Sequence, residues 1–98
     1  MRDGKDPLVL LAEAAQRGSV AALDELLKAL AQSVRTVIRN VLGSSRGGLE
    51  PMVRGALAAV RDALPRIDPN DVEAEAIEIG RQVAVLRLVR EWGADVAA

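Results

Sequence analysis

The chain has 98 residues and a formal net charge of −1, and it contains no histidine, cysteine, phenylalanine or tyrosine. Imidazole and thiolate groups supply most proton transfer, nucleophilic attack and soft-metal binding near neutral pH, so we expect neither an enzyme nor a bound cofactor. Trp92 is the one aromatic residue, which leaves few platforms for stacking unpaired bases. An Ala/Leu/Val-rich chain of this kind favours a helical module that acts by contacting other proteins.

The length and composition predict one domain over residues 1–98, with a core of Leu, Ile, Val and Ala. The absence of cysteine fits a reducing compartment, so we expect a cytoplasmic protein. The apolar run 8–11 is soon interrupted by Glu13 and is too short for a signal or membrane segment, so we expect no membrane partner.

The first half of the chain predicts two helices. Asp6 can cap the first helix, and Pro7 suits its first position. This helix should end near Arg17. Gly18 can close it in a left-handed conformation, and Ser19 can cap a second, central helix that ends at Gly43. Its apolar residues recur at spacings of three and four: Leu23, Leu26, Leu27, Leu30, Val34, Val37, Ile38, Val41 and Leu42.

A flexible connector is expected at 43–48, where the sequence is Gly-Ser-Ser-Arg-Gly-Gly. A third helix follows, with Pro51 in its first turn and Pro65 at its end. Its apolar positions at helical spacing are Met52, Val53, Ala56, Leu57, Val60 and Leu64.

Asp68-Pro69 predicts the start of a fourth helix, although Asn70 or Asp71 could be its cap. This helix should run to about Trp92 and stop at Gly93, with a frayed tail at 94–98. One expected apolar stripe holds Val72, Ile79, Val83, Leu86 and Val89 or Arg90, and a neighbouring one holds Ile77, Ala84 and Leu88. The prediction is therefore an all-α domain of four helices.

Three segments, in this order, resemble region 2 of the extracytoplasmic-function sigma factors of RNA polymerase. They are Leu10-Leu11-Ala12-Glu13-Ala14-Ala15-Gln16-Arg17-Gly18-Ser19 with Ala21-Ala22-Leu23, then Arg39-Asn40-Val41-Leu42-Gly43, then Ala63-Leu64-Pro65-Arg66-Ile67-Asp68. The resemblance covers nearly the whole chain and implies a four-helix sigma-factor region 2-like bundle. It also implies a stand-alone domain, because the second, helix-turn-helix domain of that family has no counterpart here.

The resemblance places the family's polymerase-clamp contact at the start of the third helix. Where the family carries Asp-x-Val-Gln-Glu, this chain has Pro51-Met52-Val53-Arg54-Gly55, and only the valine matches. Altered charge at a paired contact weakens binding, so tight family-style clamp binding is not expected. The partner-binding, polymerase-clamp-like face would consist of Met52, Val53, Arg54, Leu57 and Arg61.

The family places base-trapping aromatic and basic residues after its third helix, whereas this chain carries five carboxylates there and no base. They are Asp68, Asp71, Glu73, Glu75 and Glu78. Carboxylates repel DNA phosphates, so DNA binding by this chain alone is not expected. The segment is either an acidic docking site for a basic partner or a solvated helix start whose carboxylates suit the macrodipole. A metal site at residues 71, 75 and 78 is not expected, since no aspartate-rich loop completes it.

Several remaining side chains carry two interpretations each. Arg81, Gln82, Arg87 and Arg90 are either nucleic-acid contacts or the exposed side of the fourth helix. Arg46, Arg54, Arg61 and Arg66 are either a patch for polymerase or nucleic acid or ordinary surface charge. Trp92 is either an interface anchor or a cap over the open end of the bundle.

These observations favour a degenerate sigma-like domain that acts as a protein-protein interaction module in bacterial transcription or signalling regulation. Its partner would be polymerase, an anti-sigma-like or signalling protein, or a second copy. One alternative is a minimal sigma-like subunit that binds core polymerase and promoter DNA together with a second polypeptide. The other is a helical adaptor or homodimer unrelated to transcription.

Overall fold

The computed structural model describes residues 6–43 and 48–97, with side chains as far as Glu91. These residues form four α-helices and no strand, which confirms the expected all-α class. The helices are α1 (Pro7–Gln16), α2 (Val20–Leu42), α3 (Leu49–Ala63) and α4 (Val72–Ala97), with 3₁₀ turns η1 (Leu64–Arg66) and η2 (Pro69–Asp71) between α3 and α4. Within these ranges no helix is both long and apolar enough to cross a membrane.

Side-chain caps begin α1 and α2 where the sequence predicted them, whereas the cap predicted for the fourth helix at Asp68 begins η2, and α4 starts at Val72. The Asp6 carboxylate accepts a hydrogen bond from the Leu8 amide (2.8 Å), and the Ser19 hydroxyl accepts one from the Ala22 amide (3.1 Å). Asp68 accepts one from the Asn70 amide at the start of η2 (2.9 Å), so Asp68 itself is the cap there. Gly18 adopts the left-handed φ of +104° that ends the first corner.

The expected end of the fourth helix is wrong, because α4 continues through Gly93 to Ala97. A single glycine within a helix costs only about 1 kcal/mol relative to alanine, so it does not by itself end a helix. Of the expected connector 43–48, Gly43 and Gly48 have positive φ, and residues 44–47 lie outside the described residues. Ala98 also lies outside them.

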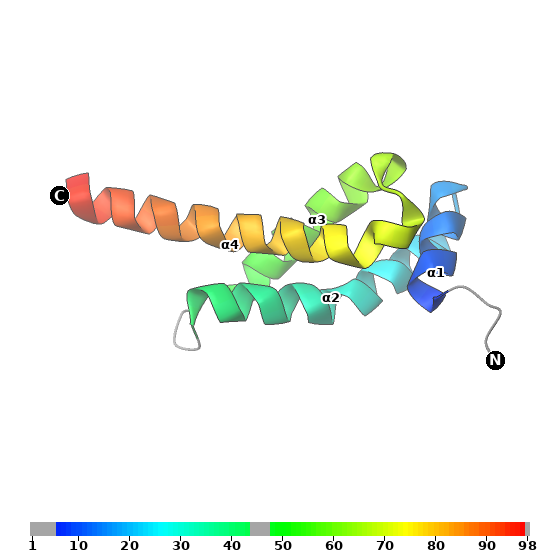
Figure 1. The fold of residues 1–98 in the computed structure, drawn as a ribbon, viewed down its shortest axis with the longest axis horizontal. Helices are drawn as coiled ribbons and strands as arrows, with labels where there is room; N and C mark the ends of the chain where they lie inside the picture. The colour runs from blue at the N-terminus through cyan, green and yellow to red at the C-terminus, as the bar shows by residue number, and fades with distance from the viewer. Residues whose placement is uncertain (1–5, 44–47, 98) are drawn as a thin grey trace.

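The helix α2 occupies the centre of the molecule and packs against α1, α3 and α4. In Figure 1, α2 and α4 run in the same direction from the end that α1 covers, and α3 returns in the opposite direction. The last turns of α4 extend beyond the end of α2. The molecule is consequently elongated, with extents of 55 × 28 × 19 Å.

In the core, a stripe of mostly large apolar residues on α2 packs against a stripe of mostly small residues on α4. The buried residues of α2 repeat at intervals of four: Ala22, Leu26, Leu30, Val34, Ile38 and Leu42. Opposite them, α4 buries Val72, Ala76, Gly80 and Ala84, again at intervals of four. The expected α4 stripes are therefore wrong in part, because Ile77, Leu86 and Val89 are exposed. Small residues face α2 because they let the two helix backbones approach closely.

A side-chain bridge holds the turn after α3. The Gln16 amide nitrogen at the end of α1 donates to the carbonyl oxygens of Leu64 (2.9 Å) and Ile67 (2.7 Å). These carbonyls lie at the ends of α3 and η1, and the Leu64 carbonyl also accepts a hydrogen bond from the Ile67 amide (3.1 Å). Gln16 thereby ties α1 to the chain segment that leads into α4.

Candidate protein-interaction site

The second half of α4 is apolar on the side that faces solvent. Val85, Leu86 and Val89 are 41%, 56% and 53% exposed, although Ala84 in the same turns is fully buried. A surface helix normally carries polar residues opposite its core face, so a helix that is apolar on both sides is typical of one that is covered. We call Glu78, Gln82, Val85, Leu86 and Val89 the α4 outer face.

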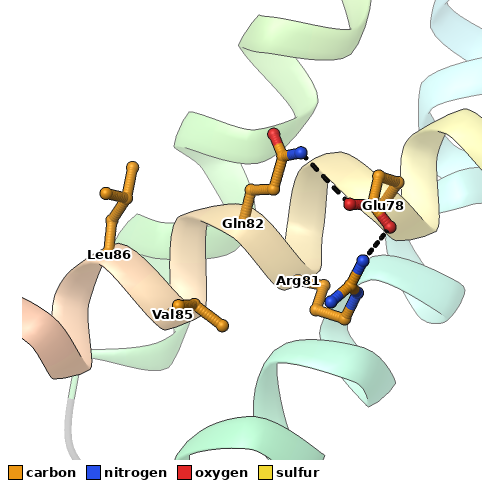
Figure 2. A pocket seen from close by; sticks show the side chains of 5 residues that line it. All are labelled: Glu78, Arg81, Gln82, Val85 and Leu86. Carbon is orange, nitrogen blue, oxygen red and sulfur yellow. Dashed lines mark hydrogen bonds and ion pairs between the residues drawn. The ribbon is translucent and has the colours of Figure 1, made fainter.

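A shallow groove crosses this face, and its first turn is polar. Figure 2 shows Arg81 and Gln82 both directed at the Glu78 carboxylate. Gln82 Nε2 donates to Glu78 Oε2 (3.1 Å), and Arg81 forms an ion pair with the other carboxylate oxygen. The hydrogen bond from Arg81 lowers the pKa of Glu78. Charge at this end is therefore satisfied within α4, and the apolar part of the groove begins at Val85 and Leu86.

A second groove lies beside the first, between α3 and α4. Met52, Val83 and Leu86 line it, together with Arg87 and Arg90. Arg87 Nε donates to Glu91 Oε2 (2.9 Å), and its guanidinium packs so close to Gly48 that a β-carbon there would lie 3.3 Å from it. Arg90 is exposed and makes no hydrogen bond or ion pair with any described residue. The groove is thus apolar inside and cationic along its edge.

The predicted polymerase-clamp-like face is divided by the fold. Met52 and Val53 are 8% and 2% exposed and belong to the core, so they do not form a free surface together. Leu57 is half-buried, whereas Arg54 and Arg61 are exposed. The burial of Met52 and Val53 follows from their position on the stripe that continues to Ala56 and Val60.

The structure adds two arginines of α2 to the exposed part of this face. Arg35 binds the Glu50 carboxylate with both ends of its guanidinium, at 3.0 Å (Nε to Oε2) and 2.9 Å (the terminal nitrogen to Oε1). These hydrogen bonds lower the pKa of Glu50, and the charges of Arg54 and Arg39 lower it further. The sequence analysis missed Arg35 and Arg39, although their spacing of four predicts a shared helix face.

Three carboxylates of the acidic segment are bound within the chain. Asp68 is the η2 cap, Glu73 Oε2 accepts a hydrogen bond from the Ser33 hydroxyl (3.0 Å), and Glu78 binds Arg81 and Gln82. Asp71 and Glu75 are exposed at the start of α4. No group of three residues able to hold a metal ion occurs among the described residues, so residues 71, 75 and 78 do not converge.

The four predicted nucleic-acid contacts do not share one face. Arg81 and Gln82 flank the polar turn of the α4 outer face, whereas Arg87 and Arg90 border the groove beside α3. Trp92 lies on α4, but its side chain is outside the described part of the structure. The sequence analysis missed Val85. Its spacing of three from Gln82 and four from Val89 is the signal that could have placed it on a common face with them.

No protein family, curated protein or solved structure matched this chain. The candidate site therefore rests on its own geometry. That geometry offers an apolar helix face and a neighbouring groove with arginines along its edge.

Proposed function

We propose that this protein is a helical protein-protein interaction module that binds its partner along the α4 outer face and the groove beside α3. The exposure of Val85, Leu86 and Val89 carries this proposal. Burying such side chains against a partner protein contributes about 25 cal/mol of binding free energy per Å² of apolar surface removed from water. Arg87 and Arg90 at the edge of the groove supply charge that can select among partners.

The finer proposal is that the domain is a degenerate, sigma region 2-like bundle of bacterial cytoplasm, retained for regulation of transcription or signalling. It is supported by the order of the three similar segments along a four-helix chain. The replaced clamp signature at 51–55 and the carboxylates that follow η1 support loss of promoter opening. Anionic side chains oppose phosphate binding, which supplies most of the affinity of DNA-binding proteins.

Two titrations test this function. The labelled full chain is titrated with bubble-containing promoter DNA, and separately with purified RNA polymerase clamp helices. Promoter opening is followed on duplex promoter DNA that carries a fluorescent base, with the chain and core polymerase present. We expect no opening and no DNA binding tighter than the non-specific range of about 1–100 µM. Clamp binding with a Kd of about 1 µM or tighter together with promoter opening would overturn the proposal in favour of a minimal sigma-like subunit.

Site-specific crosslinking tests the location of the interface. A photoreactive amino acid at position 89 should give a discrete protein adduct in a bacterial host, and Leu86→Glu should abolish it. Leu10 provides the matched control, since it is 51% exposed on α1 and lies outside the proposed surface. Adducts from position 10 but not from position 89 would exclude the α4 outer face as the docking surface.

A further inference from the structure

The shape of the α4 outer face indicates what kind of segment covers it. Glu78, Gln82, Val85 and Val89 follow one another at spacings of four, three and four, opposite the buried stripe of Ala76, Gly80 and Ala84. A seam with this spacing matches the packing of a second α-helix laid along the first, since knobs-into-holes contacts repeat every 3.5 residues. The occupant is therefore best described as one helix.

A second copy of this chain fits the seam poorly in either direction. A parallel pair would place Glu78 against the other Glu78 and bring the two Arg81 side chains near each other. An antiparallel pair with Val85 opposite Val89 would place Gln82 and Glu78 against positions 92 and 96, which are both apolar in the sequence. Burying a charged side chain against apolar ones is costly, so self-pairing is disfavoured.

The charges beside the apolar residues are cationic on the side of the groove next to α3. Arg90 is exposed and unpaired among the described residues, and Arg87 lies over Gly48, the cap residue of α3. The start of α3 adds the positive end of its helix dipole at the same place. Arg87 already binds Glu91, so carboxylates on a partner would complement Arg90 and the start of α3.

We infer that the α4 outer face takes a separate amphipathic helix whose apolar edge covers Val85, Leu86 and Val89 and whose flanking carboxylates meet Arg90. This inference rests on the proposed function and specifies the chemistry of its partner. The partner helix carries apolar residues at intervals of three and four, with Glu or Asp beside them. These carboxylates would let the protein distinguish its partner helix from amphipathic helices that lack them.

Two designed peptides test the inference with the full chain. Both are about three heptads long, with leucine at the seam positions that meet Val85, Leu86 and Val89 and glutamine at those that meet Glu78 and Gln82. They carry either glutamate or lysine at the flanking positions. Binding is followed by fluorescence anisotropy and by the methyl NMR signals of Val85, Leu86 and Val89. We expect the glutamate peptide to bind about tenfold more tightly at low salt, and Arg90→Glu to reverse that preference. Lys28→Glu reverses an exposed charge on α2 at a residue that lines neither groove, and it should leave the preference unchanged.

Each other outcome overturns the inference in an identifiable way. Equal binding of both peptides along α4 would reject the acidic helix while leaving the docking face of the proposed function intact. Methyl shifts absent from α4 with either peptide would reject both. Sedimentation showing a dimer that Leu86→Glu dissociates would make a second copy the occupant.

Discussion

Gly80 shows how one missing side chain determines the packing of α4 on α2. A β-carbon at this position would lie 2.9 Å from Cγ1 of Val37 and 3.3 Å from Cγ1 of Val34. We therefore expect Gly80→Leu to lower the free energy of unfolding by about 1–3 kcal/mol through overpacking. Urea denaturation followed by circular dichroism measures this change.

Gly55 is the matched control for Gly80, because it lies within α3 and a β-carbon there meets nothing within 4 Å. Gly55→Ala should raise the free energy of unfolding by about 0.5–1 kcal/mol, since alanine loses less backbone entropy in a helix. A Gly80→Leu protein as stable as the parent would refute the close contact between α2 and α4.

Gln16 is a second residue whose role depends on one side chain. Gln16→Ala removes both hydrogen bonds to the Leu64 and Ile67 carbonyls. We expect a loss of about 1–2 kcal/mol in the free energy of unfolding, measured by urea denaturation. Gln82→Ala removes an exposed hydrogen bond within α4 and should change stability by less than about 0.5 kcal/mol. Similar losses in the two variants would contradict a special role for Gln16.

At the scale of elements, the Arg35–Glu50 ion pair joins α2 to α3 and makes this contact dependent on pH. The hydrogen bonds from Arg35 lower the pKa of Glu50 in the folded state. A carboxylate with a lowered folded pKa stabilises the fold above its ordinary pKa, and the contribution is lost as the pH falls through the folded value. The parent should therefore lose more stability on acidification from about pH 5 to about pH 3 than Glu50→Gln does.

Carboxyl NMR titration supplies the direct check on this pair. Arg35→Gln should move the pKa of Glu50 upward, because it removes the largest of the interactions that lower it. An unchanged pKa in that variant would show that the ion pair does not persist in solution.

The α4 outer face and the core beneath α4 should differ in how strongly they respond to substitution. Replacing the exposed Leu86 with Gln should change the free energy of unfolding by less than about 0.5 kcal/mol, because little buried area is lost. In the core, Leu30→Ala on α2 should lower the free energy of unfolding by about 2–5 kcal/mol, since Leu30 is fully buried. Thermal and urea unfolding of both variants measure the difference. A large destabilisation by Leu86→Gln would indicate that the α4 outer face packs within the protein.

At the scale of the whole molecule, the extension of α4 makes the protein less compact than its length implies. The radius of gyration is 15.2 Å, whereas a globular domain of about 100 residues has about 13 Å. Small-angle scattering of the 10.4 kDa monomer should give a value close to that of the structure. A value near 13 Å would show that the end of α4 folds back onto the bundle.

The helix caps and the approximate positions of the helices could be predicted from the sequence without the tertiary structure. Asp6, Ser19 and Asp68 cap where sequence reasoning placed them, because a side-chain oxygen satisfies nearby amides through contacts a few residues long. The apolar residues of α2 recur at spacings of three and four, and this periodicity predicted a central helix. The all-α class followed from these helices and the absence of strand alternation.

The assignment of faces on α4 was decided only by packing. Apolar residues lie on more than one side of the second half of this helix, and neither of the two predicted stripes contained Ala76 or Gly80. The close approach of α2 buried the stripe of Ala76, Gly80 and Ala84, because small residues allow the backbones to meet, and left Leu86 and Val89 exposed. The candidate site followed from that choice. The sequence by itself determined where helices begin and which residues are apolar, whereas contact between helices determined which apolar residues remain available to a partner.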